Sequence, residues 1–463
     1  MADQTVTIRF EGRPLACRTG TSVAAALWEN GIRDLSHSPK YGRPRGVTCA
    51  RGQCTACLMR VDGVPNVRVC ETPVHEGMDV RRQDTGAFYG APMQRVLAAG
   101  DGLFPVGFYY KWFTRPPFVS RAFLRGIRPL TGIGRLPDRS ATLRALPAAT
   151  AATAPARDLG RWDTVVVGAG AAGLRAAAVA GGRVLLLDEN AEPGGLRLAA
   201  LRELRAAGVL ERCDGLARAL ATLDEAVARA QDAGVTLRLG ARVVAGYAGG
   251  GLLVRTGSEL ATLQAERVVW AGGALDAPGL FPGNDVPGCL GPRALLRLLV
   301  RDGLVVRGMP VLVTGSGLDL RLAAALLTVR GAQVSLVVTG PEHRHDVAAA
   351  VEMKWPLTTG LALASLARGA QGRVAAVFAP AGTANGPGAS HLRLEADLVV
   401  VCSRGKPAYD VPFQLGAELV LDPARGGFVA PDDALLPGRI GFAAVGEAGG
   451  RRPEDVLGTE VTP

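Results

Sequence analysis

The hydrophobic pattern of this chain changes character near residue 160. Before that point, polar and apolar residues alternate over short stretches, which is the pattern of half-buried strands. The expected elements are strands at 5–10, 57–61 and 67–70, with an Asp62-Gly63 turn between the last two, and a helix at 23–30 that Thr21 or Ser22 caps. Residues 1–85 are therefore predicted to form a small α+β module of the β-grasp type.

After residue 160, continuous apolar runs lead into glycine-rich turns and then into helices, which is typical of a parallel sheet buried on both faces. Strands are expected at 163–167, 183–187, 267–270, 309–314, 333–338 and 397–402. The fold class is α/β with an N-terminal α+β module. The expected domains are 1–85, a connecting segment at 86–158, a first nucleotide domain at 159–276 that resumes at 395–463, and a second one inserted at 277–394.

Four cysteines in the N-terminal module have the spacing of an iron–sulfur site. Cys49, Cys54 and Cys57 form C-x4-C-x2-C, and Cys70 follows on a later segment. This is the thiolate pattern of a plant-type [2Fe–2S] cluster. Small residues between the cysteines leave backbone N–H groups free to point at the sulfurs, which tunes the reduction potential. The spacing therefore predicts one-electron transfer.

Other uses of these cysteines fit their spacing and context less well. Zinc sites more often contain two C-x-x-C knuckles, and only one is present here. A thioredoxin-like pair at Cys54 and Cys57 needs a βαβ context that the flanking sequence does not offer. A disulfide framework is not expected in a long chain whose start lacks a signal peptide. Zinc and an empty relic remain the alternatives to the cluster.

The first glycine-rich turn lies in the context of a dinucleotide site. Gly168, Gly170 and Gly173 form G-x-G-x-x-G between a strand and a helix, and Asp188 ends the next strand, 20 residues after the first glycine. The glycines permit a tight turn, close approach of a pyrophosphate and helix–strand packing. The helix N-terminus attracts phosphates, and Asp188 is expected to accept from ribose hydroxyls.

The second glycine-rich turn is less complete. Gly315 and Gly317 follow an apolar strand, but Leu320 stands where the third glycine is usual, and the next strand ends in Thr339 rather than an acid. Two interpretations stay open: a site for NAD(P) or another adenine nucleotide, and a structural half that has lost its nucleotide.

Composition excludes some classes of function. The net charge of +10 is spread along the 463 residues, so we expect no nucleic-acid partner and instead an acidic protein partner or an anionic cofactor. No apolar run approaches the ~18 residues of a membrane span, and a cytoplasmic location is expected. The five histidines form no triad or metal set, and no hydrolase or P-loop motif is present. No catalytic residue is predicted, since the chemistry would belong to cofactors.

These motifs carry a resemblance to known families. The two glycine-rich turns resemble those of pyridine-nucleotide-dependent flavoproteins, where the first site holds FAD and the second NAD(P), and Gly446-Glu447 is similar to their C-terminal Gly-Asp. The N-terminal module, with the aromatic stretch PVGFYYKWF at 105–113, resembles the alpha subunit of heterotetrameric sarcosine oxidase. It is also similar to relatives in hydrogen cyanide synthase, opine oxidase and multisubunit proline or hydroxyproline dehydrogenases.

The resemblance implies an electron-transfer subunit of an amine or amino-acid dehydrogenase or oxidase acting on a substrate like sarcosine, proline, hydroxyproline or glycine. Its cofactors would be [2Fe–2S] and FAD, and its partners a glycine-oxidase-like flavoprotein subunit and a further small subunit. The implied cofactor-binding set also includes Glu189, Gly195, Gly272, Gly446 and Glu447. Alternatives are a stand-alone NAD(P)H-dependent FAD reductase that passes electrons through the cluster, and a structural subunit that has lost flavin binding.

Three departures from the related proteins stand out. The folate-binding half of sarcosine oxidase alpha has no counterpart in the sequence, so tetrahydrofolate chemistry is not expected. No cysteine lies between Pro193 and Arg212, where disulfide reductases of this fold carry a redox pair. The stretch from Gly173 to Asp188 is shorter than in the family by roughly one helical turn.

Overall fold

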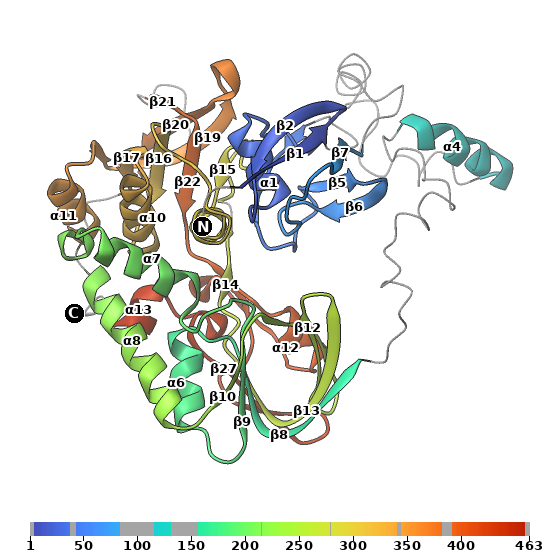
Figure 1. Cartoon of the computed structure of the whole chain (residues 1–463), viewed down its shortest axis with the longest axis vertical. Helices are drawn as coiled ribbons and strands as arrows, with labels where there is room; N and C mark the ends of the chain where they lie inside the picture. The colour runs from blue at the N-terminus through green and yellow to red at the C-terminus, as the bar shows by residue number, and fades with distance from the viewer. Residues whose placement is uncertain are drawn as a thin grey trace. The chain divides into compact units, whose positions relative to one another are not determined.

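A computed structural model of the chain describes residues 4–37, 43–83, 115–130, 156–213, 215–277, 279–339, 344–381 and 391–458 (Figure 1). The chain divides into two units, one formed by 1–153 with 285–289 and 302–304, and the other by the remaining residues. The aromatic stretch 105–113 and the Pro/Ala/Thr-rich run 146–155 lie outside the described residues.

The first unit contains a five-stranded sheet in the order β2-β1-β7-β5-β6. Its strands are β1 Thr5–Phe10, β2 Arg13–Arg18, β5 Leu58–Val61, β6 Val64–Arg68 and β7 Asp79–Arg82. Strand β7 lies parallel to β1 and antiparallel to β5. The turn between β5 and β6 has positive φ at both Asp62 and Gly63, as a tight hairpin requires. The strand expected at 67–70 is β6, which ends at Arg68. Cys70 therefore follows this strand and does not lie in it, contrary to the prediction.

Helix α1, Val23–Glu29, packs into the first unit with nearly all of its side chains buried. Ser22 caps it, since its Oγ accepts the N–H of Ala25 at 3.3 Å. The same hydroxyl donates to Asp302 at 2.9 Å, so the segment 302–304 contacts the N-terminus of this helix within the first unit. The unit also contains β3 Ser36–His37, β4 Pro44–Arg45 and α4 Pro117–Leu130.

The second unit is built on an eight-stranded sheet. Strands β10, β9, β8, β13 and β27 are parallel neighbours in that order, and β12, β11 and β26 add antiparallel pairs. Their bounds are β8 Arg157–Val167, β9 Val184–Leu187, β10 Thr236–Arg238, β11 Ala241–Tyr247, β12 Gly251–Thr256, β13 Glu259–Trp270, β26 Ala434–Leu436 and β27 Ile440–Ala444. Since β27 pairs with β13, the end of the described chain returns to the sheet that opened the unit.

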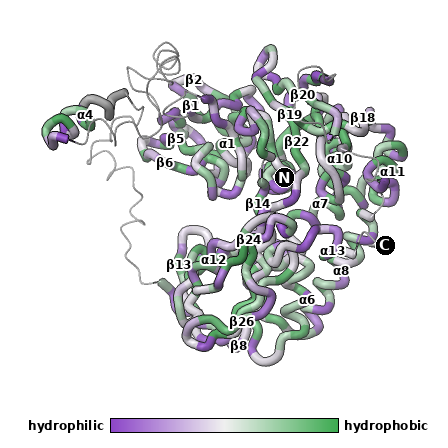
Figure 2. Tube along the Cα trace, turned by 180° about the vertical axis from the view of Figure 1, so that it is seen from behind, coloured by the Kyte–Doolittle hydropathy of each residue, from purple (hydrophilic) through white to green (hydrophobic). Residues whose placement is uncertain are grey.

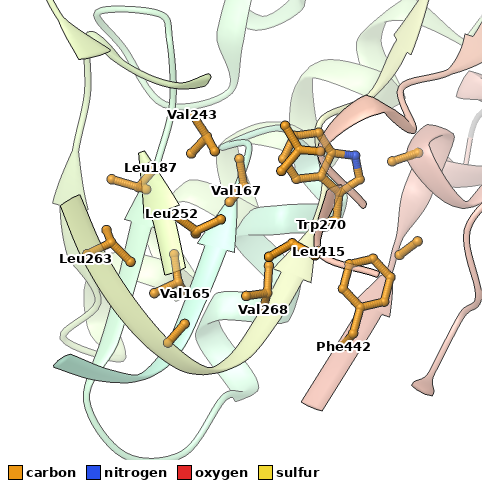
Figure 3. Packing of buried hydrophobic residues seen from close by; sticks show 14 of the residues in the cluster. Val165, Val167, Leu187, Val243, Leu252, Leu263, Val268, Trp270, Leu415 and Phe442 are labelled. Carbon is orange, nitrogen blue, oxygen red and sulfur yellow. The ribbon is translucent and has the colours of Figure 1, made fainter. Parts of the chain in front are cut away.

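Both faces of this sheet are buried, which explains the continuous apolar runs in the sequence. Val165, Val167 and Trp270 point into one cluster with Phe442 of β27 (Figure 3). Alternate residues such as Val166 point into a second cluster with helices α6 Ala171–Val179 and α8 Leu216–Asp232. The Trp270 indole N–H is satisfied by the carbonyl of Ala408 at 2.6 Å.

A smaller parallel sheet carries the second glycine-rich turn. Its strands β22, β16, β17 and β18 are parallel neighbours in that order, and the apolar β22 is green in Figure 2. An antiparallel sheet, β19-β20-β21, stands beside them in the same unit. The bounds are β16 Pro310–Gly315, β17 Gln333–Val338, β18 Leu357–Thr359, β19 Leu361–Arg368, β20 Val374–Pro380, β21 Leu392–Ala396 and β22 Leu398–Cys402.

Several shorter elements complete the second unit. The helices are α7 Gly195–Ala206, α9 Pro292–Leu296, α10 Leu318–Val329, α11 Arg344–Met353, α12 Asp410–Gln414 and α13 Pro453–Leu457. Single turns of helix are η2 Leu210–Arg212, η3 Arg297–Arg301, η4 Ala370–Gly372, η5 Pro423–Arg425 and η6 Gly446–Gly449. The remaining strands are β14 Ala274–Leu275, β15 Cys289–Leu290, β23 Lys406–Pro407, β24 Val420–Asp422 and β25 Gly427–Val429.

Candidate functional site

The four predicted cluster cysteines lie together in the first unit, and backbone amides point at their sulfurs. Cys49 Sγ accepts the N–H groups of Arg51 and Cys54, both at 3.4 Å. Cys70 Sγ accepts the N–H of Gly52 at 3.3 Å. Gly52 has a φ of +67°, and a Cβ there would lie 2.2 Å from the Glu71 carboxylate, so the loop needs glycine at this position. The loop is thus shaped to surround sulfur with donors.

The four thiols form one connected hydrogen-bonded group. The side chains of Cys54 and Cys70 hydrogen-bond to Cys49, and Cys70 also hydrogen-bonds to Cys57. These bonds lower the pKa of Cys49 and of Cys57, whose thiolates they favour. A [2Fe–2S] cluster takes four thiolates on two irons, and a group of four mutually close thiols suits that requirement. Within the described residues, no group of three or more His, Cys, Asp or Glu side chains is placed to hold a single metal ion.

The other four cysteines are buried in ordinary packing. Burial raises the pKa of the thiol to about 11 in Cys17 and to about 12 in Cys213 and Cys289, and it also raises the pKa of Cys402. Thiols of this kind are unreactive and act as small apolar side chains. Hydrogen bonding among their own thiols distinguishes Cys49, Cys54, Cys57 and Cys70 from these four, and they stay the predicted ligands of the cluster.

The first glycine-rich turn has the geometry that a dinucleotide requires. A Cβ on Gly168 would lie 2.2 Å from the carbonyl oxygen of Ala271, and one on Gly173 would lie 1.9 Å from the carbonyl oxygen of Gly168. Both glycines therefore serve close packing of helix α6 against the strands. A Cβ on Gly170, at the N-terminus of α6, would meet nothing within 4 Å. The open space beside Gly170 is where a pyrophosphate can approach the backbone.

Asp188, at the end of β9, is tied to the same turn. Its Oδ2 accepts the N–H of Ala169 at 2.6 Å, and its Oδ1 accepts the backbone and side-chain N–H groups of Asn190 at 2.7 Å. Burial nevertheless raises the pKa of Asp188. A carboxylate offers about four lone-pair positions, so three protein bonds leave capacity for a ribose hydroxyl. Asp188 thus orients the turn, and its role toward a ribose stays a prediction.

Residues from the end of the chain meet the first turn of α6. Gly446 has a φ of +64°, and a Cβ there would lie 2.6 Å from Cβ of Ala172. The neighbouring Glu447 carboxylate instead pairs with Arg197, at 2.5 Å, and with Arg293. Burial alone would raise the pKa of Glu447, but these two guanidinium groups lower it to about 2.

The ion pairs around Glu447 form a cluster that was not foreseen from the sequence. Arg197 also contacts Asp319 at 2.9 Å, and Arg293 contacts Asp319 and Asp276, both at 3.4 Å. We call Arg197, Arg293, Asp276, Asp319 and Glu447 the arginine–carboxylate cluster. Its members come from α7, α9, α10, η6 and the segment after β14. No local sequence pattern links residues so far apart.

The remaining predicted residues have mainly structural contacts. Glu189 pairs with Arg242 at 2.8 Å and lies 3.9 Å from Arg297. Gly195 begins α7 with a φ of +65°. A Cβ on Gly272 would lie 2.6 Å from the Trp270 ring. Their predicted role in holding a cofactor stays a prediction.

The second glycine-rich turn has a backbone like that of the first, but side-chain carboxylates occupy its N–H groups. A Cβ on Gly315 would lie 2.0 Å from the carbonyl oxygen of Cys402, matching Gly168. The N–H of Gly317 donates to Asp346 Oδ2 at 2.8 Å, and the N–H of Leu318 donates to Glu454 Oε1 at 2.5 Å. The residues at this turn do not fit a pyrophosphate, because carboxylates already occupy the donors it would use.

A cavity of about 450 Å³ opens beside this second turn. It lies at the ends of β16, β17 and β22, where open parallel sheets usually bind ligands. Its lining includes Asp319, Glu454, Arg404 and Arg452. Burial and the nearby Arg452 charge lower the pKa of Arg404.

Known proteins resemble the N-terminal module and, at lower identity, most of the chain. Residues 3–85 match the family described as "2Fe-2S iron-sulfur cluster binding domain". Sarcosine oxidase subunit alpha of Rhizobium meliloti is 27% identical over 354 residues, covering 72% of this chain and 34% of that protein. Hydrogen cyanide synthase subunit HcnA of Pseudomonas aeruginosa is 36% identical over 78 residues, 17% of this chain and 74% of that protein.

Among solved structures, L-proline dehydrogenase from P. horikoshii aligns with a TM-score of 0.57 at 17% identity, covering 97% of this chain and 69% of that chain. The fold and the two sites define an iron–sulfur protein with a Rossmann-type flavoprotein fold, which confirms the predicted fold class. The chain belongs to the sarcosine oxidase alpha-like family. It spans about a third of the length of the Rhizobium meliloti relative. None of the helices in the described part of the chain is long and apolar enough to cross a membrane.

Proposed function

We propose that this chain is the electron-transfer subunit of a complex that oxidises an amine or amino acid, with FAD in its first Rossmann half and a [2Fe–2S] cluster in its N-terminal module. The observation that carries the proposal is the presence, in one chain, of four thiols that hydrogen-bond to one another and a glycine turn open at Gly170. FAD can accept two electrons and an iron–sulfur cluster passes them one at a time, so a chain that holds both can convert a two-electron oxidation into single-electron transfer.

The residues of the chain have distinct tasks in this proposal. The N-terminus of α6 and the open face of Gly170 hold the FAD pyrophosphate, and Asp188 accepts from the ribose while it fixes the turn through Ala169. Gly446 brings the C-terminal segment to the same helix end. In the first unit, the N–H groups of Arg51, Cys54 and Gly52 stabilise negative charge on sulfur.

Amine oxidation itself is assigned to a partner subunit. The relatives named sarcosine oxidase subunit alpha are subunits by name, and the described residues of this chain offer the two cofactor sites rather than an acid–base pair beside an open substrate pocket. A glycine-oxidase-like flavoprotein is the partner that the family resemblance supports. The positive charge of this chain, +10, favours an acidic partner surface.

Purification of the complex from its native host tests the proposal. We expect co-purification with a second flavoprotein, absorbance of both flavin and iron–sulfur, and dye reduction that depends on sarcosine, proline, hydroxyproline or glycine. A complex that contains both cofactors but reduces no dye with any amine or amino acid would contradict the amine assignment. A chain without flavin or iron would favour the purely structural role.

A further inference from the structure

The two glycine-rich turns of the second unit have the same backbone plan but opposite surroundings. In both, the first glycine packs closely against a backbone carbonyl oxygen at the end of a neighbouring strand. An added Cβ would lie 2.2 Å from that oxygen at Gly168 and 2.0 Å from it at Gly315. The second glycine differs. A Cβ on Gly170 would meet open space, whereas one on Gly317 would lie 2.4 Å from Glu454 Oε1. In the second turn, a carboxylate of the chain itself stands where a phosphate would approach.

The backbone donors of the second turn are used by carboxylates. Asp346 accepts the N–H of Gly317, and Glu454 accepts the N–H of Leu318, the first residue of α10. A dinucleotide pyrophosphate binds to these same groups at the start of a Rossmann helix. The two side chains therefore satisfy the helix N-terminus internally and hold negative charge at the phosphate position.

Both carboxylates are fixed in place. Asp346, on α11, is 1% exposed and pairs with the equally buried Arg321 at 2.7 Å. Glu454, on α13, is 7% exposed. A phosphate could enter only by displacing buried charges from their partners, which is strongly unfavourable. If they stayed, the phosphate would face two like charges at close range.

The adjoining cavity does not restore the site. Its lining combines the carboxylates of Glu454 and Asp319 with the guanidinium groups of Arg293, Arg404 and Arg452. These arginines do not free the backbone N–H groups of the turn, which Asp346 and Glu454 occupy. Leu320, fully buried, also replaces the third glycine of the motif. The cavity lies where a Rossmann fold binds a nucleotide, but the backbone donors that would bind the phosphates are not available.

We infer that the second Rossmann half is closed to NAD(P) and to other nucleotides that carry a pyrophosphate, because Asp346 and Glu454 act as internal substitutes for the phosphates. Its role is architectural, since α10 also supplies Asp319 to the arginine–carboxylate cluster. Electrons then do not enter this chain from NAD(P)H at the second half. The inference concerns the second half alone and stands whether or not the partner oxidises an amine.

Nucleotide binding to the full chain, saturated with FAD so that the first half is filled, tests the inference directly. Equilibrium dialysis with labelled ADP, NAD⁺ and NADP⁺ should show no saturable binding up to about 1 mM, the upper end of ordinary substrate affinities. Saturable binding of one ADP or NAD(P) per chain would overturn the inference. No variant is needed for this measurement.

A double-mutant cycle tests the position of the carboxylate. Gly317→Ala should lower the urea midpoint of the wild-type chain, because Gly317 has a φ of +88° and a Cβ there would lie 2.4 Å from Glu454 Oε1. In the Glu454→Ala background the same change should lower the midpoint by less, because the backbone strain remains but the clash with Oε1 is gone. The exposed Glu418 supplies the matched control, and Glu418→Ala should leave the effect of Gly317→Ala unchanged. Additive effects of Gly317→Ala and Glu454→Ala would contradict the placement of Glu454 at the turn.

Discussion

The guanidinium group of Arg197 binds the carboxylate of Glu447 at 2.5 Å, although 250 residues separate them in the chain. Arg197 lies in α7, the helix that follows β9 of the large sheet, and Glu447 lies in η6, directly after β27 of the same sheet. Asp319 of the second Rossmann half contacts the same arginine. One ion-pair cluster therefore connects the two halves of the second unit.

We expect Glu447→Gln to destabilise the chain strongly. The substitution leaves Arg197 and Arg293 buried with one carboxylate fewer, and removing one partner of a buried ion pair typically costs about 3 kcal/mol or more. Urea unfolding at neutral pH measures the loss. Glu266→Gln is the control, since Glu266 is exposed and lies 3.9 Å from Arg161, and it should change the free energy of unfolding by less than about 0.5 kcal/mol. Equal effects of the two changes would contradict the role of the cluster.

The same residue predicts a pH dependence. The folded pKa of Glu447 is lowered from its usual 4.5 to about 2, so the stabilisation from this carboxylate is complete above about pH 4.5 and is lost as pH falls toward 2. The difference in unfolding free energy between wild type and Glu447→Gln should therefore shrink over that range. Urea unfolding of both proteins at several pH values measures it. A difference that stays constant down to about pH 3 would argue against the lowered pKa.

Substitution of any one of Cys49, Cys54, Cys57 and Cys70 by Ser should remove the cluster. Each thiol is one of four ligands to two irons, so its loss leaves an iron under-coordinated. We expect iron and acid-labile sulfide to fall well below two per chain, together with the visible absorbance of the cluster. Cys213→Ala, a buried cysteine outside the set, should retain both. Full iron content in all four Ser variants would reject the assignment.

Two glycines of the first turn should separate folding from flavin binding. Gly170→Ala introduces a Cβ into open space, so the fold should keep its stability while FAD affinity falls at least tenfold, about 1.4 kcal/mol. Gly173→Ala places a Cβ 1.9 Å from the Gly168 carbonyl oxygen and should reduce both stability and FAD content. The measurements are FAD content after dialysis and urea unfolding of the FAD-free chain.

The control for these two changes is Gly181→Ala, since a Cβ there meets nothing within 4 Å and the position lies after the end of α6. It should affect neither measurement. If Gly170→Ala left FAD binding intact, the open space beside Gly170 would not be the pyrophosphate position.

The local spacing of residues was enough to predict the cysteine loop and the first glycine-rich turn. The C-x4-C-x2-C loop brings three thiols together within nine residues, and the glycine turn at 168–173 forms between adjacent elements. Features of this kind depend on backbone geometry over a few residues, so the sequence displays them directly. The apolar runs likewise predicted a parallel sheet, because strands buried on both faces leave no polar alternation.

Only the tertiary structure decided which of the two glycine-rich turns has space for a phosphate. Gly170 and Gly317 are equivalent in sequence, yet one faces empty space and the other faces Glu454, which lies 137 residues further along the chain. The arginine–carboxylate cluster likewise joins α7, α9 and α10 to η6. Charged side chains meet across such separations only after helices and sheets have packed, because no repeat or spacing in the sequence encodes a contact between distant surfaces.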